Sequence, residues 1–113
     1  MTSVADPQAQ DFDLTDKYRP NSGPVLLTGV QAIARMLIEN HSRERRVGRN
    51  VASFVSGYQG SPLAAVDKVF GEVPDLDAHA ITFVPGLNEE LGATSVWGSQ
   101  QELPKGTRTH DGV

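Results

Sequence analysis

The chain has 113 residues, no cysteine and a formal net charge of −4, and these three facts already exclude several classes of protein. Without cysteine, these residues form no disulfide, no thiolate-ligated zinc site and no iron–sulfur cluster. The mild acidity argues against a nucleic-acid or membrane-surface partner, because proteins that bind such partners are normally basic. No apolar run approaches the ~20 residues of a membrane span, and the first residues lack the features of a secretion signal. We therefore expect one cytoplasmic domain.

The first 24 residues are polar and contain several aspartates and prolines, with no sustained apolar period. This composition predicts an N-terminal arm over residues 1–24, partly disordered, ahead of a folded region over residues 25–113. Three side chains are candidates to dock the arm on that region: Phe12, Leu14 and Tyr18.

An amphipathic helix is predicted next. Thr28 and Gln31 match a capping box, and apolar residues then recur at helical spacing up to Ile38. Gly48 is expected to end the helix. The last turn holds three arginines, which we interpret as a solvated helix end that suits the helix dipole, with phosphate binding as the alternative: Arg43, Arg45 and Arg46.

Two short apolar runs, 50–56 and 80–84, predict strands, and each is followed by a helix. After the first strand, Ser61 is the predicted N-cap and Pro62 the first helical residue. After the second, Asn88 is the predicted cap of a helix that runs to about residue 101. Strands that alternate with crossover helices predict an α/β fold with a parallel sheet.

The interior of the last predicted helix is composed mostly of small residues, including Gly92 and Gly98. Glycine in a helix interior costs about 1 kcal/mol relative to alanine, so two of them need a reason. We expect that another helix, a neighbouring chain or a flat ligand approaches this helix closely.

Ligands of parallel α/β sheets bind beyond the carboxyl ends of the strands. The loop 57–62 offers backbone N–H groups and a hydroxyl for an anion, or it is simply a tight strand-to-helix turn. Glu89 and Glu90 open the last helix, where a carboxylate accepts a proton or hydrogen bond, or merely complements the helix dipole. The histidines are too scattered for a metal site, and we interpret each as a surface residue: His41, His79 and His110.

Four segments in this order resemble the amino-terminal part of indolepyruvate ferredoxin oxidoreductases, which are thiamine-diphosphate-dependent 2-oxoacid:ferredoxin oxidoreductases. The segments are residues 27–32, 54–63, 85–91 and 96–101. The most specific blocks are Gly-Tyr-x-Gly-Ser-Pro-Leu and Gly-Leu-Asn-Glu-Glu, and the resemblance extends from about residue 14 to residue 113. It implies an incomplete thiamine-diphosphate pyrimidine-binding domain with a parallel α/β sheet.

The resemblance also implies roles for particular residues. Glu89 matches the family's glutamate that hydrogen-bonds the cofactor's aminopyrimidine ring and promotes loss of the reactive proton, so it would be both catalytic and cofactor-binding. Tyr58, Gly60 and Asn88 would shape the cofactor-binding loops. Two further residues are candidates for substrate contact, Ser61 and Gln59. Relatives commonly carry arginine at the position of Gln59.

The implied activity is oxidative decarboxylation of an aryl or other 2-oxoacid to an acyl-CoA, with electrons passed to ferredoxin. The family's Gly-Asp-Gly…Asn motif for the magnesium–diphosphate and its cluster cysteines are not among these 113 residues. We therefore expect an amino-terminal fragment, inactive alone, that shares thiamine diphosphate and Mg²⁺ with the remainder of the oxidoreductase or a second subunit. The iron–sulfur clusters would lie on that remainder. Coenzyme A and ferredoxin would be partners of the complete enzyme, expected to be a homo-oligomer.

Two other classes of function stay open at this point. One is a non-catalytic interaction or regulatory remnant that retains the fold. The other is a small nucleotide- or CoA-binding α/β protein, which rests on the loop 57–62 alone.

Overall fold

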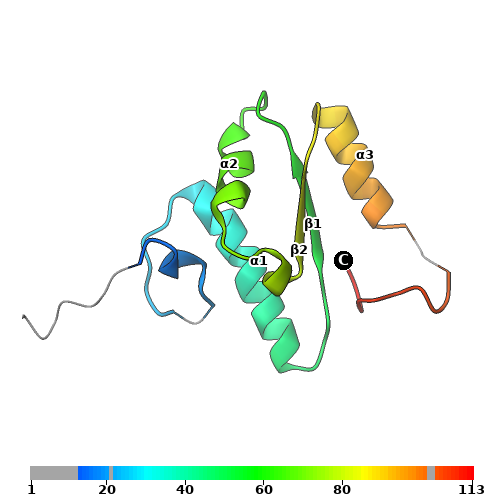
Figure 1. Ribbon diagram of the computed structural model, residues 1–113, viewed down its shortest axis with the longest axis horizontal. Coiled ribbons are helices and arrows are strands. Elements are labelled where there is room, and N and C mark those ends of the chain that lie inside the picture. The colour runs from blue at the N-terminus through cyan, green and yellow to red at the C-terminus, as the bar shows by residue number, and fades with distance from the viewer. Residues whose placement is uncertain (1–12, 21, 102–103) are drawn as a thin grey trace, which may run out of the picture.

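A two-stranded parallel sheet lies between helices that cover both of its faces (Figure 1). Strand β1 (Ser53–Gly57) pairs with strand β2 (Ile81–Pro85), so that both carboxyl ends lie at the same edge of the sheet. The pairing sets Ser53 opposite Ile81 and Gly57 opposite Pro85. The computed structural model describes residues 13–20, 22–101 and 104–113.

Helices α1 (Gly29–Arg46) and α2 (Ala64–Glu72) pack on one face of the sheet, and α3 (Glu89–Ser99) packs on the other (Figure 1). The predicted α/β class with parallel strands is thereby confirmed. Within the described residues, no helix combines the length and apolar character needed to cross a membrane.

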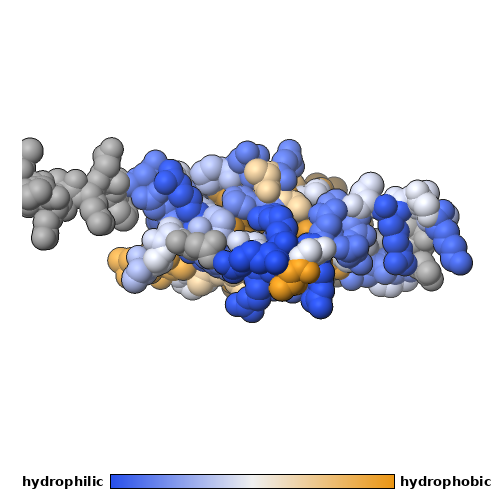
Figure 2. Space-filling model, turned by 90° about the horizontal axis from the view of Figure 1, so that it is seen from below, coloured by the Kyte–Doolittle hydropathy of each residue, from blue (hydrophilic) through white to orange (hydrophobic). Residues whose placement is uncertain are grey.

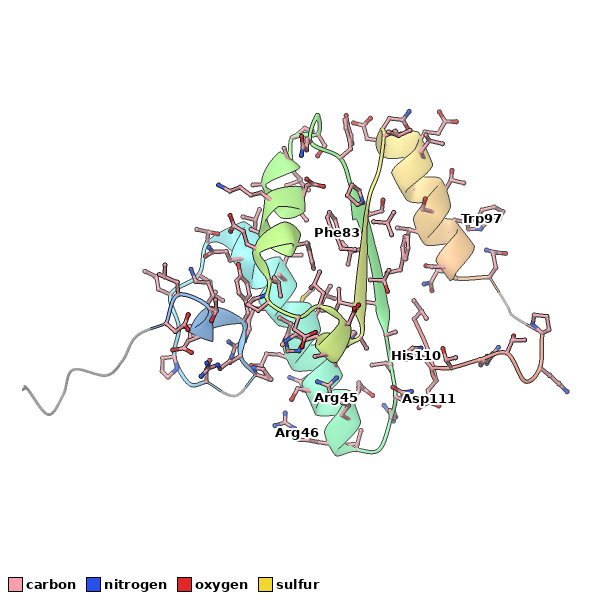
Figure 3. All side chains as sticks on the ribbon, viewed as in Figure 1. Arg45, Arg46, Phe83, Trp97, His110 and Asp111 are labelled. Carbon is pink, nitrogen blue, oxygen red and sulfur yellow. The ribbon has the colours of Figure 1, made fainter. Side chains whose placement is uncertain are left out.

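The hydrophobic core lies between the sheet and the α1–α2 layer. Side chains alternate between faces along a strand, and Phe83 of β2 points to this layer and stacks on Phe70 of α2, with ring centroids 5.5 Å apart (Figure 3). The buried core residues come from both helices, β2, the turn after α2 and the chain ahead of α1: Tyr18, Ala34, Ile38, Val69, Phe70, Val73 and Ile81.

Part of the predicted N-terminal arm docks on this core. Residues Asp16–Tyr18 form a short 3-10 helix, η1, and Tyr18 is only 6% exposed. Buried Arg35 of α1 holds the segment, because its Nη1 donates to the Lys17 carbonyl at 2.7 Å and to the Ser22 hydroxyl at 3.1 Å. Of the other docking candidates, Leu14 is exposed and Phe12 lies outside the described residues.

His41 of α1 was expected at the surface, and that prediction is wrong, since it is 1% exposed. Its Nδ1 lies against the carbonyl of His79, in the 3-10 helix η2 (Asp77–His79), and its Nε2 lies 2.9 Å from the Ser53 hydroxyl. Because a carbonyl only accepts, Nδ1 carries a proton, and in the neutral imidazole Nε2 then accepts from the Ser53 hydroxyl. One side chain thus joins α1, η2 and β1.

The last residues of the chain run beside the other edge of β1. The backbone N–H of Ser53 donates to Ala80 on the β2 side, whereas that of Ala52 donates to Gly112 at 2.9 Å. Gly112 also forms a parallel bridge with Val51. Successive backbone groups of a strand point to opposite edges, so this segment lies on the edge of β1 away from β2.

The structure confirms two predicted helix starts and corrects a third. Thr28 and Gln31 form the capping box of α1, and Asn88 caps α3 by accepting from the Leu91 N–H at 2.8 Å. Helix α2, however, begins at Ala64 and not at Pro62. The Ser61 hydroxyl accepts instead from the Leu63 N–H at 3.1 Å, which closes a turn ahead of the helix.

Candidate functional site

Two loops meet beyond the carboxyl ends of the strands, at the top of Figure 1. One is the loop 57–62, which leads from β1 to α2, and the other is the turn 86–88, which leads from β2 to α3. The Gly86 N–H donates to the Gly57 carbonyl at 2.7 Å, so the loops are joined where they leave the sheet. This is the position at which ligands of parallel α/β sheets bind.

Tyr58 and Glu89 are in direct contact across these loops. The Tyr58 hydroxyl donates to Oε1 of Glu89 at 2.7 Å, although the residues are 31 positions apart in the sequence. This hydrogen bond stabilises the protonated phenol and raises the pKa of Tyr58, and desolvation raises it further. Glu89 is solvent-exposed, and within the described residues its second carboxylate oxygen has no hydrogen-bond partner.

Gly60 lies directly against the Tyr58 ring. A Cβ placed on Gly60 would sit 2.5 Å from Cε2 of Tyr58 and 3.2 Å from its Cδ2. Real Cβ atoms essentially never approach a carbon so closely, so any side chain at position 60 would displace the ring. The second glycine of the Gly-Tyr-x-Gly block is therefore needed to leave room for the Tyr58 ring.

The other predicted site residues surround this contact and do not join it. Asn88, one residue before Glu89, is occupied as the cap of α3. The Ser61 hydroxyl is bonded within its own turn. Gln59 points toward α2, where its Nε2 donates to Oδ2 of Asp67 at 3.3 Å. The structure thus brings Tyr58, Gly60 and Glu89 together and leaves the two proposed substrate contacts beside them.

Ser56 is a further residue of interest that the sequence patterns did not single out. Its Oγ is buried between β1 and α3 and has no hydrogen-bond partner among the described residues. A Cβ on Gly86 would lie 3.3 Å from this oxygen, and a Cβ on Gly92 would lie 3.4 Å from it. The small residues of α3 had suggested close approach by another helix, a neighbouring chain or a ligand. At Gly92 the neighbour is strand β1 of the same chain, whereas no atom of the described residues lies within 4 Å of a Cβ on Gly98.

The outer face of α3 carries little that the fold buries. Gly92, which faces β1, is the one buried residue of the helix, and Trp97 points away from the sheet with 67% of its surface exposed (Figure 3). Near its first turn α3 approaches β1 at Gly92, and directly after its end the Gln100 side chain donates to the Val113 carbonyl at 3.0 Å.

Three other features lie away from this site. The three arginines at the end of α1 are exposed, and Arg45 and Arg46 are at the lower end of the molecule (Figure 3), where the surface is mostly hydrophilic (Figure 2). A cavity of about 360 Å³ lies between the end of α3 and the segment 108–113, beside the start of β1. In the parts of the chain that the structure describes, no group of three or more acidic or histidine side chains is arranged to hold a metal ion.

Comparisons with protein-family models, with curated proteins and with solved structures give no match to this chain.

Proposed function

We propose that the chain is the pyrimidine-binding portion of a thiamine-diphosphate-dependent 2-oxoacid:ferredoxin oxidoreductase of the indolepyruvate type. The observation that supports this most directly is the position of Glu89. It lies in the first turn of α3, just beyond the carboxyl end of β2, with its carboxylate exposed and hydrogen-bonded to Tyr58. The two sequence blocks that most resemble the family supply these two residues.

The residues present fit the pyrimidine end of the cofactor. The Glu89 carboxylate is solvent-exposed and accepts a hydrogen bond at 2.7 Å from the Tyr58 phenol, so it lies at the strand ends as an acceptor. The nearby Ser56 hydroxyl is a buried polar group without a partner among the described residues, at the same end of the sheet. The magnesium–diphosphate end is assigned by this proposal to residues outside the chain.

Within this proposal, Glu89 is the residue that takes part in proton movement. When bound, thiamine diphosphate supplies an electron-accepting centre at which a 2-oxoacid loses CO₂. Glu89 would share a proton with a ring nitrogen of the aminopyrimidine through a carboxylate oxygen. Asn88 fixes the start of α3 and thereby the position of that carboxylate. Transfer of the acyl group to coenzyme A and of electrons to ferredoxin would need the remainder of the enzyme.

A binding experiment tests the proposal on the chain as it stands. Thiamine and thiamine diphosphate with Mg²⁺ are titrated into the labelled protein, and chemical-shift changes are followed by NMR. We expect changes at the strand ends and at least tenfold weaker binding by Glu89→Ala. Glu90→Ala is the matched control, because Glu90 is an exposed carboxylate in the same helical turn, whereas the Tyr58 hydroxyl donates to Glu89.

Two outcomes would contradict the proposal. One is no shift change with either compound at millimolar concentration. The other is an equal loss of affinity in Glu89→Ala and Glu90→Ala, which would indicate a general charge effect. A remnant of the fold without cofactor function predicts the first outcome, and a nucleotide- or CoA-binding protein predicts binding of those ligands without thiamine.

A further inference from the structure

We infer that Tyr58 is a cover for Glu89: its phenol is bound to Oε1 of the carboxylate, competes with the aminopyrimidine for that carboxylate, and is displaced when the ligand binds. This inference rests on the proposed function. It makes Tyr58 a competitor of the ligand, a role different from shaping the loop. Tyr58 would then be a positioning residue that keeps the carboxylate in place until the ligand arrives.

The contact is well defined on both sides. Glu89 is held by the Asn88 cap and by the bond between Gly86 and Gly57 at the strand ends. Tyr58 directly follows β1, and its carbonyl accepts from the Ser61 N–H at 3.2 Å, which closes the turn beneath the ring. The 2.7 Å distance between the Tyr58 hydroxyl and Glu89 is typical of a good O–H···O hydrogen bond.

The same geometry lets the ring leave. Tyr58 is half-buried, Glu89 is exposed, and position 60 presents no side chain to hold the ring from below. A hydrogen bond in such a solvated place is worth only a few-fold in an equilibrium constant. A ligand that places its own donor on the carboxylate and stacks at the strand ends therefore has little to overcome.

Removal of the Tyr58 phenol oxygen distinguishes a side chain that covers Glu89 from one that only supports the loop. If Tyr58 covers Glu89, then Tyr58→Phe frees the carboxylate and thiamine binds about fivefold more tightly. If Tyr58 only supports the loop or contacts the ligand directly, the same change leaves the affinity unchanged or weakens it. Tyr18→Phe is the matched control, because it removes the same atom from the buried core and leaves the site untouched.

The experiment measures thiamine affinity by NMR for the wild type, Tyr58→Phe and Tyr18→Phe, together with the Tyr58 ring resonances. We expect tighter binding by Tyr58→Phe alone and a shift of the Tyr58 ring signals when thiamine binds the wild type. A second readout needs no ligand: the absorbance titration of Tyr58 should move to lower pH in Glu89→Gln, since the bond to the carboxylate raises its pKa.

The outcomes separate the inference from the proposed function. Thiamine binding that depends on Glu89 but is equal or weaker in Tyr58→Phe would overturn the inference and leave the proposed function intact. Absence of binding in every variant, Tyr58→Phe included, would overturn the proposed function and the inference with it. An unchanged tyrosine titration in Glu89→Gln would overturn the contact itself.

Discussion

Two serines on strand β1 lie in opposite situations, and substitution of each by alanine should change stability in opposite directions. The Ser56 hydroxyl faces α3, buried and without a partner among the described residues. The Ser53 hydroxyl faces α1 and donates to the buried imidazole of His41. The two changes remove the same atom from the same strand, so differences in strand propensity cancel to first order.

The expected magnitudes follow from hydrogen bonding. A buried polar group without a partner costs about 1–3 kcal/mol, so Ser56→Ala should raise the free energy of unfolding by about 1 kcal/mol after some loss of packing against Gly86 and Gly92. Ser53→Ala leaves Nε2 of His41 without its donor and should lower the free energy of unfolding by about 1–3 kcal/mol.

Urea unfolding at pH 7, followed by circular dichroism, measures both changes. Ser56→Val is an additional variant: its methyl groups would crowd Gly86 and Gly92, and we expect a loss of about 1–3 kcal/mol. If Ser56→Ala and Ser53→Ala shift stability in the same direction, the reasoning is refuted. Stabilisation by Ser56→Val would likewise show that α3 does not approach β1 closely at this point.

Two further predictions concern the loop after β1 and the effect of pH. Gly60→Ala should push the Tyr58 ring off Glu89 and lower the Tyr58 pKa toward its ordinary value, which an absorbance titration measures. Gly71→Ala is the control and should leave that titration unchanged, because a Cβ there meets no atom of the described residues within 4 Å. Burial, with help from Arg45, lowers the pKa of His79 below 6.5, so the unfolded chain protonates first as the pH falls. The contribution of neutral, buried His79 to the free energy of unfolding is fully present above pH ~6.5 and is lost as the pH falls through the folded-state pKa. The urea midpoint should therefore depend less on pH in His79→Gln than in the wild type, and an identical dependence would contradict this.

Much of the fold follows from local signals in the sequence. The cap residues Thr28 and Asn88 satisfy backbone groups within the next few residues, so their role is legible without any tertiary information. The strand predictions differ from β1 and β2 by at most a few residues, because strand ends depend on which backbone groups find partners across the sheet.

The errors arise where a tertiary contact decides the outcome. Ser61 looks like an N-cap, but its hydroxyl closes a turn two residues ahead and the helix begins later. His41 looks like a surface residue, but two partners from distant segments, His79 and Ser53, satisfy both ring nitrogens and allow its burial. No short-range pattern contains those partners.

In the candidate site, too, local sequence indicates some features and tertiary contacts decide the others. Its sequence blocks are specific only in their order and separation along the chain. The contact between Tyr58 and Glu89 joins residues 31 positions apart and depends on the parallel pairing of β1 with β2. That pairing brings both loops to one edge of the sheet, and the bond from Gly86 to Gly57 fixes their separation.

The placement of Glu89 therefore depends on restraints that lie within a few residues of the strand ends. The Asn88 cap sets the first turn of α3, and the close approach of Gly92 to Ser56 seats that turn on β1. The rest of α3, including Trp97, is largely exposed. A carboxylate held by so local a set of contacts keeps its position while the outer face of its helix remains open to solvent, which is the arrangement that a ligand approaching the strand ends requires.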